Sequence, residues 1–170
     1  MDEVLLRPAT LDDAGPVAAC VCEAYVHYVE RIGRQPMPML EDYPAVIRAC
    51  QVQVAVEQGR IVGIIVLKVT EDGFYIDNVA VRPAVKGRGI GRRLLEFAEA
   101  EAQRQGYPSI CLATHERMTE NRALYARIGY VEFEGRTMSG FPRVMMRKSL
   151  VGDPATEQAT RLVSSSPSGV

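Results

Sequence analysis

Apolar residues in the first 50 positions recur mainly at helical spacing. Thr10, followed three residues later by Asp13, is typical of a helix start. The run "RIGRQPMPML" contains a glycine and two prolines, which interrupt a helix. This part of the chain is therefore predicted to contain a short strand at residues 4–8, a helix at 11–30, a loop at 31–40 and a second, shorter helix at 41–50.

From residue 51 the hydrophobic period changes to two. The stretch "QVQVAVEQGRIVGIIVLKV" alternates apolar and polar residues, turns at Gln58-Gly59 and returns, which is the signature of a β-hairpin. "EDG" predicts a second turn, and "FYIDNVAV" predicts a third strand. Three consecutive antiparallel strands are therefore expected.

The period then changes back to that of a helix. Ile90, Leu94, Ala98 and Ala102 lie on one helical stripe, which ends near Gly106. From residue 151 the composition shifts to Ser, Thr, Pro and Gly, which is typical of a mobile tail. The remaining predictions are a buried strand at 109–114, a short helix at 119–129, closing strands at 130–137 and 143–150, one domain at 1–150 and a polar tail at 151–170.

The composition sets limits on the function. A chain of 170 residues has the size of one ordinary domain, and a formal net charge of -1 argues against a protein that coats nucleic acid. Its apolar runs are too short to cross a bilayer, and its start lacks a basic region leading into an apolar segment. We therefore expect a cytoplasmic protein with neither a membrane nor a nucleic acid as partner.

The cysteines and histidines do not indicate a metal site. The chain has four Cys and two His, with no Cys-x-x-Cys and no His-Glu-x-x-His. The cysteines are expected to be buried or inert thiols, and no metal is expected to be bound.

The stretch with the most chemical information is "NVAVRPAVKGRGIGRRLL", in which a strand runs into a helix across three glycines. A helix start presents free main-chain N–H groups, and glycines allow a ligand to approach them closely. Lys86, Arg88, Arg92 and Arg93 add positive charge around this start. The pattern predicts an anion site that suits a diphosphate.

Two common phosphate motifs do not match this stretch. The Walker loop needs Lys-Ser/Thr after its last glycine, and no such pair follows here. A dinucleotide fingerprint needs Gly-x-Gly-x-x-Gly, but Gly87, Gly89 and Gly91 are spaced two apart and antiparallel strands precede them.

The stretch resembles motif A of the GCN5-related N-acetyltransferases (GNAT), whose consensus is Gln/Arg-x-x-Gly-x-Gly/Ala. Here the motif reads Lys86-Gly87-Arg88-Gly89-Ile90-Gly91, with lysine as a departure in the first place. Downstream, "TENRALYARIGYVEF" resembles motif B, with an asparagine at the start of its helix and a tyrosine four residues later. The resemblance covers residues 4–150 in element order, and its specific part is 78–133.

This resemblance implies a single α/β (α+β) GNAT-like domain. Its central sheet would be mixed and mostly antiparallel, with six to seven strands and about four flanking helices. The sheet would splay between the strand that ends at Val81 and the strand at residues 109–114.

The resemblance also implies acetyl-CoA or coenzyme A as a cosubstrate. Its pyrophosphate would lie on the amides of residues 87–92, and its pantetheine arm would pair with the main chain of Val79 and Val81. The cofactor-binding residues implied in this way are Val79, Ala80, Val81, Lys86, Gly87, Arg88, Gly89, Ile90, Gly91, Arg92, Asn121 and Tyr125.

Two residues are candidates for catalysis. Tyr125, which matches the motif B tyrosine, would hydrogen-bond the departing sulfur. An amine with the pKa of lysine must lose a proton at pH 7, which costs about 4 to 5 kcal/mol, and Asp77 is the candidate base because its strand parity matches that of Tyr75, Val79 and Val81. The alternatives are a strand-edge role for Asp77 and other carboxylates as the base, namely Glu23, Glu30, Glu41 and Asp42.

The pocket for the second substrate would be walled by the first two helices, their loop and the loop before the last strand. Its apolar candidates are Tyr25, Tyr28, Met37, Met39 and Phe141, and the arginines that could fix a carboxylate are Arg31, Arg34, Arg136 and Arg143. These side chains could equally pack the helices on the sheet or be solvated.

The expected function is N-acetyl transfer from acetyl-CoA to a primary amine, on a small molecule or a peptide, by direct attack in a ternary complex. No cysteine stands beside a histidine in sequence, so no covalent acyl-enzyme is expected. The alternatives are an acyl-CoA-binding or regulatory module without turnover, and an interaction protein for a phosphorylated or nucleic-acid partner. A homodimer is possible.

Overall fold

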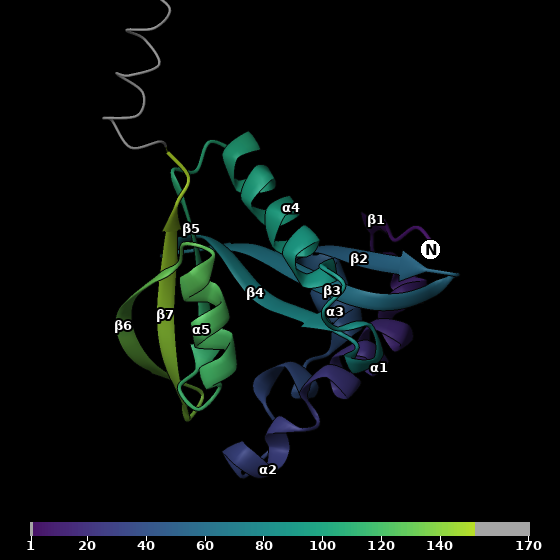
Figure 1. The fold of residues 1–170 in the computed structure, drawn as a ribbon, viewed down its shortest axis with the longest axis horizontal. Coiled ribbons are helices and arrows are strands. Elements are labelled where there is room, and N and C mark those ends of the chain that lie inside the picture. Colours follow the sequence, from purple (N-terminus) through teal and green to yellow (C-terminus); the bar gives the residue numbers. More distant parts are fainter. Residues whose placement is uncertain (1, 152–170) are drawn as a thin grey trace, which may run out of the picture.

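The computed structural model describes residues 2–151 and shows a seven-stranded sheet with helices on both faces (Figure 1). The tail expected at 151–170 lies outside the described residues apart from Val151. The strands are β1 (Leu5–Pro8), β2 (Gln51–Glu57), β3 (Arg60–Thr70), β4 (Gly73–Val81), β5 (Ser109–His115), β6 (Val131–Met138) and β7 (Phe141–Ser149). The α-helices are α1 (Ala14–Tyr25), α2 (Tyr28–Ile32), α3 (Tyr43–Ala49), α4 (Ile90–Arg104) and α5 (Thr119–Arg127), and short 3₁₀ helices occupy Leu11–Asp13, Met37–Leu40 and Pro83–Val85.

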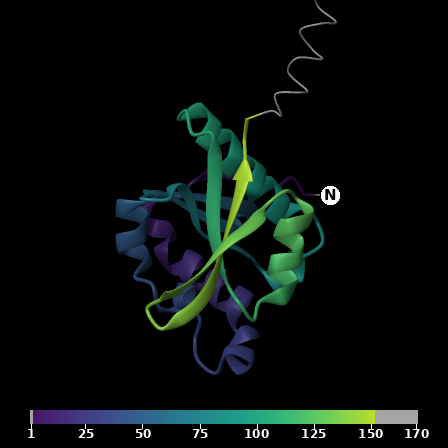
Figure 2. The ribbon, with the colours of Figure 1, turned by 90° about the vertical axis from the view of Figure 1, so that its left-hand side faces the viewer.

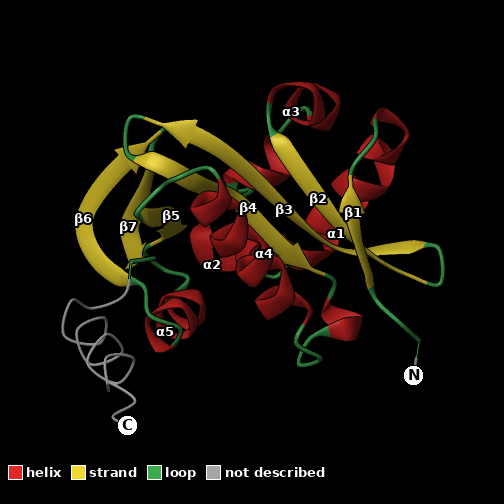
Figure 3. Ribbon diagram, turned by 90° about the horizontal axis from the view of Figure 1, so that it is seen from above, coloured by secondary structure: helices red, strands yellow, loops and turns green. Residues whose placement is uncertain are grey.

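The strand order is β1-β2-β3-β4-β5-β7-β6, which Figure 3 shows from above. Only the β4–β5 pair is parallel, and every other neighbouring pair is antiparallel. The β6–β7 hairpin closes one end of the sheet and lies in front in Figure 2. The predicted mixed, mostly antiparallel sheet is therefore confirmed.

The alternating sequence of β2 and β3 folds as the predicted hairpin. Gln58 and Gly59 both have positive φ, at 49° and 74°, as a tight two-residue turn requires. Val54 and Ile64 are paired across the hairpin and fully buried. The periodicity was informative here because the pairing is local.

The helices bury apolar stripes on opposite faces of the sheet. α4 packs Leu94 and Ala98 on one face, in a cluster that also includes Ile65 and Leu112. α1 packs Val17, with other apolar residues, on the other face against a second cluster that includes Ile64 and Tyr43. These three layers place the start of α4 beside the end of β4.

The contact of β3 with α4 depends on Gly63. A Cβ at this position would lie 3.1 Å from Leu94 Cδ1 and 3.2 Å from Ile90 Cγ2, both tighter than ordinary side-chain contacts. The missing side chain lets the first turn of α4 approach the sheet closely, and Gly91 then lies next to Val81. The position of the α4 start is thus set by packing as well as by its own glycines.

The helix predicted at residues 11–30 is divided into α1 and α2 by a turn at 26–27. The buried positions Val17, Val21, Ala24 and Tyr28 keep helical spacing through this turn, so the hydrophobic pattern could not reveal it. The predicted helix start is confirmed, because the main-chain N–H of Thr10 donates to the Asp13 carboxylate at 2.7 Å.

All four cysteines are free thiols, and Cys20 and Cys111 are buried. Cys22 is exposed, so the expectation of buried or inert thiols does not describe its accessibility. None of the helices in residues 2–151 combines the length and the apolar character needed to cross a membrane.

Candidate active site

A β-bulge interrupts β4 at Asp77. Ile76 pairs with Leu67 and Asn78 pairs with Val66, so Asp77 is the extra residue. Beyond the bulge, Val79 and Val81 pack against the cluster under α4, whereas Tyr75 packs in a separate cluster with Cys111 and Met145. The prediction that Tyr75, Asp77, Val79 and Val81 all face the same side is therefore wrong, because one inserted residue reverses strand parity between Tyr75 and Val79.

β4 and β5 separate soon after they meet. They pair only through residues 74–76 of β4 and 110–112 of β5, so the remainder of β4 has no partner on that side. The N–H of Arg82 donates to the Val62 carbonyl at 2.8 Å, and hydrogen bonding alternates along an antiparallel strand. The N–H groups of Val79 and Val81 therefore point toward the open edge. This is the expected splay.

The start of α4 is built from glycines in left-handed conformations. Gly87 and Gly89 both have φ of 80°, which L side chains rarely adopt. The first helical hydrogen bond runs from the N–H of Arg93 to the Gly89 carbonyl at 3.0 Å. The N–H groups of residues 90–92 are thus left free, as at any helix start, and carry the positive end of the helix dipole.

Two of the four predicted cations lie at this helix start. Lys86 and Arg92 line the cleft beside it. The side chain of Arg88 instead forms a bidentate ion pair with Glu57 on β2. Arg93 donates to the main-chain carbonyl of Val4 at 2.9 Å. The side chains of Arg88 and Arg93 are therefore held away from the cleft, and Arg88 can contribute there only through its main chain.

The cleft between α4 and α5, here called the α4–α5 cleft, has a volume of about 610 Å³. It is lined by residues 79–81 of β4 and is bordered by Tyr25 of α1 and Tyr28 of α2. α5 contributes Asn121, Leu124 and Tyr125. The helix begins at Thr119, and Met118 is its N-cap.

Tyr125 is a buried residue of the cleft lining. Its ring packs edge-on against Tyr130, with 5.8 Å between ring centroids, and only 7% of the residue is exposed. Burial, with a smaller contribution from Tyr28, raises the pKa of the Tyr125 hydroxyl well above its usual value. No hydrogen bond joins this hydroxyl to another group in residues 2–151, so it is a protonated donor at neutral pH.

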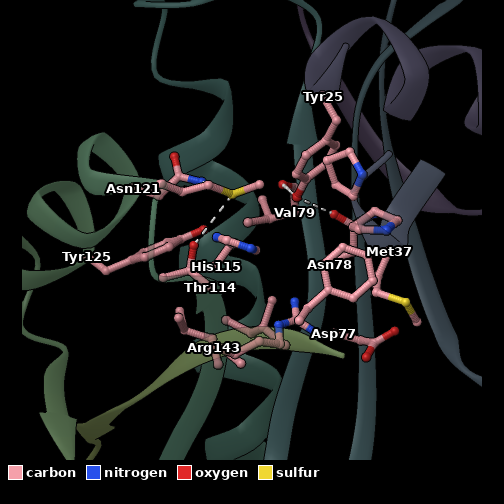
Figure 4. A pocket seen from close by; sticks show the side chains of 17 residues that line it. Tyr25, Met37, Asp77, Asn78, Val79, Thr114, His115, Asn121, Tyr125 and Arg143 are labelled. Atoms are coloured by element: carbon pink, nitrogen blue, oxygen red, sulfur yellow. Dashed lines mark hydrogen bonds between the residues drawn. The ribbon is translucent and has the colours of Figure 1, made fainter. Parts of the chain in front are cut away.

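A small inner hollow adjoins the cleft, and a second, outer hollow adjoins the inner one. The inner hollow, of about 40 Å³, is lined by Tyr25, Asn78, Tyr125 and Arg143 among others (Figure 4). The outer hollow, of about 110 Å³, shares Asn78 and Arg143 with it. Four residues line both the cleft and the inner hollow, namely Tyr25, Val79, Asn121 and Tyr125. This set of four is called the junction below.

A family model described as "Acetyltransferase (GNAT) domain" matches residues 48–132, half of the chain. The chain belongs to the GNAT acetyltransferase family. The match begins just before β2 and ends in β6, and thus includes the bulge, the α4 start and α5.

Two curated relatives of this GNAT chain share part of its sequence. A mycothiol acetyltransferase from Jonesia denitrificans is 36% identical over 80 residues, which are 46% of this chain and 26% of that protein. An IAA acetyltransferase from Azospirillum brasilense is 33% identical over 81 residues, which are 46% of this chain and 53% of that protein. The chain therefore spans about half or less of the length of these relatives.

Solved structures confirm the GNAT fold. The PaiA N-acetyltransferase from Thermoplasma acidophilum, solved in complex with coenzyme A, matches 86% of this chain and 99% of its own. The TM-score is 0.73 and the sequence identity is 17%. A likeness at this identity concerns the fold, and the site of this GNAT chain has to be argued from its own residues.

A polar network that the sequence analysis missed crosses the inner hollow of this GNAT domain. The Tyr25 hydroxyl donates to Asn78 Oδ1 at 2.8 Å and lies 3.3 Å from the Val79 carbonyl. Asn78 Nδ2 donates to the Tyr43 hydroxyl at 3.4 Å, which donates to the Pro38 carbonyl at 2.5 Å. The sequence signal for this network was an asparagine inside an apolar strand, because a polar side chain buried there needs hydrogen-bond partners.

Asp77 lies in both hollows and not in the α4–α5 cleft. Its carboxylate is 2.7 Å from Lys68 Nζ, and 23% of the side chain is exposed. Figure 4 shows it across the inner hollow from Tyr125. Asp77 thus borders the two hollows and not the cleft, and its carboxylate is held in an ion pair.

The alternative carboxylates have other surroundings. Glu23 pairs with Arg82 at 2.5 Å, and Asp42 caps α3 by accepting from the N–H of Ala45. Glu41 lines the outer hollow and is exposed, whereas Glu30 lines neither the cleft nor the hollows.

The predicted pocket residues are divided between the two spaces. Met37, Phe141 and Arg143 line the inner hollow, and Tyr28 and Arg31 line the α4–α5 cleft. Met39, Arg34 and Arg136 line none of these spaces. The predicted acceptor pocket therefore contains one arginine of the four.

Proposed function

We propose that this chain is an N-acetyltransferase that moves the acetyl group of acetyl-CoA directly to a primary amine in a ternary complex. The observation that carries this proposal is the junction, where the α4–α5 cleft and the inner hollow meet at Tyr25, Val79, Asn121 and Tyr125. A thioester reaching in from the cleft and an amine reaching in from the hollow would meet there without a covalent intermediate. A homodimer stays a prediction.

The chain's own donors suit coenzyme A. The free N–H groups at residues 87–92 are proposed to hold its pyrophosphate, and Lys86 and Arg92 to add positive charge. Val79 and Val81 are proposed to pair their edge N–H groups with the pantetheine arm, as an added strand would. Ala80 holds β4 to β3 between them, Ile90 anchors the helix start in the core, and Asn121 would bind the arm through its amide.

Acetyl-CoA supplies an activated acyl thioester, and Tyr125 is proposed to donate a hydrogen bond to its sulfur as negative charge develops there. In water, proton transfer from a tyrosine to a thiolate runs uphill by roughly 2 kcal/mol. Burial raises the pKa of Tyr125 further, which widens this gap. Tyr125 therefore acts as a hydrogen-bond donor and does not need to lose its proton fully.

Asp77 is proposed to accept the proton of the amine. It borders the inner hollow, where its carboxylate forms an ion pair with Lys68. Replacing Asp77 by Asn is expected to lower kcat/KM at pH 7 by about 10²-fold, and the loss should shrink near pH 10, where the amine is neutral without a base. An equal loss at every pH would show that Asp77 is not the base.

Release of free thiol from acetyl-CoA, measured over a panel of amines and short peptides, tests the proposed function. Thiol release that requires an amine, with mass spectrometry showing the N-acetyl product, is the expected result. Tight binding of coenzyme A with no product from any amine would instead favour an acyl-CoA-binding module. Absence of coenzyme A binding in calorimetry would overturn the assignment of the α4–α5 cleft.

A further inference from the structure

The four arginines near the predicted acceptor pocket have different partners. Three of them are engaged by groups inside the protein, which fixes their guanidinium groups outside the hollows. These are Arg31 with Glu120 at 2.6 Å, Arg34 over the Phe141 ring at 3.5 Å from its centroid, and Arg136 with Asp72 at 2.8 Å. Arg143 has no ion pair and no side-chain hydrogen bond with any residue in the part of the chain described.

Arg143 stands in the wall that the two hollows share. It pairs with His115 in the β5–β7 register, and its side chain lines both hollows with Asp77 and Asn78. In Figure 4 it rises from β7 between Tyr125 and Asp77. Arg143 thus lines the same inner hollow as the four residues of the junction.

The other charged groups of the hollows do not neutralise Arg143. Lys68 and Asp77 form an ion pair with each other at 2.7 Å. Burial lowers the pKa of His115, and the nearby Arg143 adds to this effect, so the imidazole is neutral at pH 7. Glu41 is exposed at the rim of the outer hollow, where solvent screens its charge. The inner hollow therefore has one positive charge without a counter-ion from residues 2–151.

The shape and lining of the hollows restrict what could supply that counter-ion. Met37, Pro38 and Phe141 give the inner hollow apolar walls, and the two hollows are small. A guanidinium binds a carboxylate through two parallel hydrogen bonds, and the single charges of the two groups match. A phosphate dianion would bring more negative charge than one arginine balances.

We propose that Arg143 binds a carboxylate of the amine acceptor, so that the substrate is an amino acid or another small amine that carries a carboxylate. This inference rests on the proposed acetyl transfer. The amine would lie at the junction beside the thioester, a short apolar segment would contact Met37 and Phe141, and the carboxylate would meet Arg143. A peptide would present an uncharged amide at that position and would leave the guanidinium unpaired.

Matched acceptor pairs test this proposal. Each pair consists of an amino acid and its carboxamide, which share the amine and the side chain and differ in the charge near Arg143. For the parent protein, KM is expected to be lower for the amino acid. Arg143→Gln should raise KM for the amino acid by about 10- to 100-fold, the range for a lost charged hydrogen bond, and should change KM for the carboxamide by less than about threefold.

Two further variants complete the design. Arg136 is the residue opposite Arg143 in the β6–β7 register, and it lines neither hollow, so Arg136→Gln should preserve the preference for the amino acid. Arg143→Lys keeps the charge, so it should weaken the preference for the amino acid only in part. If Arg143→Gln does not fold, Arg143→Lys tests the carboxylate site in its place. In calorimetry, all three variants should bind coenzyme A with the same affinity as the parent protein.

The outcomes separate the two proposals. If coenzyme A binds but neither member of any pair is acetylated, the proposed function is wrong. If both members are acetylated equally well by the parent, or if Arg143→Gln and Arg143→Lys leave the ratio of their KM values unchanged, acetyl transfer stands and the carboxylate site is wrong.

Discussion

The α4–α5 cleft and the inner hollow meet at the junction but are built from different parts of the chain. At the cleft, the groups proposed to contact a ligand are main-chain N–H groups, from residues 87–92 and from the edge of β4. In the hollow they are side chains, such as Tyr25, Asn78 and Arg143, that come from α1, β4 and β7. The cleft thus depends on backbone conformation, and the hollow depends on which residues stand on distant elements.

The largest effect is expected at the junction, where the two regions meet. Replacing Tyr125 by Phe removes the proposed donor to the sulfur while keeping the ring, and kcat should fall by about 10²-fold with little change in KM for either substrate. Steady-state kinetics with saturating amine measure this change. Tyr130→Phe is the control, because the Tyr130 hydroxyl is directed to Glu99 at 3.4 Å. A similar loss of kcat in both variants would assign the effect to packing of the two rings.

The next effect separates the cleft from the hollow. Gly89→Ala forces a side chain into a left-handed conformation at φ of 80°, which costs about 1 to 2 kcal/mol and turns the neighbouring N–H groups. Affinity for coenzyme A should fall about tenfold, and KM for the amine should not change. Calorimetry and kinetics measure the two quantities.

Gly106 offers a matched control at the other end of α4. It has φ of 85° and open space around it, so Gly106→Ala should lower the free energy of unfolding by a similar amount. The affinity for coenzyme A should not change. Equal affinity losses in the two variants would contradict a specific role for the α4 start.

The difference between the regions explains what the sequence could reveal. The glycines of the α4 start, and Asn121 and Tyr125 on α5, lie in short motifs whose residues are close in sequence. Their positions follow from local conformation, so the strand, the start of α4 and the short helix α5 were predictable. The hairpin of β2 and β3 was predictable for the same reason.

The hollow could not be predicted in the same way. The bulge at Asp77 is a property of the β3–β4 register, which no local pattern records, and it reversed the predicted face of Val79 and Val81. Tyr25 and Asn78 are 53 positions apart in sequence, and their hydrogen bond exists only because α1 crosses β4. The sequence offered four candidate arginines and could not rank them. Arg143 stands out only in the structure, because each of the other three has a partner there.

A smaller effect is expected from the polar network of the hollow. Tyr25→Phe leaves Asn78 Oδ1 without its donor, which should raise KM for the amine by about two- to tenfold and leave the affinity for coenzyme A unchanged. Tyr107→Phe is the control, since Tyr107 lines neither the cleft nor the hollows. If Tyr25→Phe lowered the affinity for coenzyme A and left KM for the amine unchanged, Tyr25 would act in the cleft and not in the hollow.

The smallest effect concerns the anchor of α1, the helix that carries Tyr25. Two guanidinium hydrogen bonds from Arg7, together with the Thr10 N–H, lower the pKa of Asp13 to about 2. A carboxyl group whose pKa is lowered by folding stabilises the protein at pH values above its pKa in the unfolded state. This contribution is lost as the pH falls toward its pKa in the folded state. Asp13→Asn should therefore lower the free energy of unfolding by about 1 to 2 kcal/mol at pH 7, and the difference from the parent should shrink between pH 4 and pH 2.

Urea unfolding at several pH values measures that difference, with Asp12→Asn as the control. Asp12 is exposed in the same turn and has no ion pair with the described residues, so its replacement should change stability by less than about 0.5 kcal/mol. The α4 start is proposed to hold coenzyme A through main-chain groups, which do not titrate. The affinity for coenzyme A at pH 7 should therefore be the same in Asp13→Asn and the parent. A weaker affinity would mean that the cleft, like the hollow, depends on how α1 is anchored.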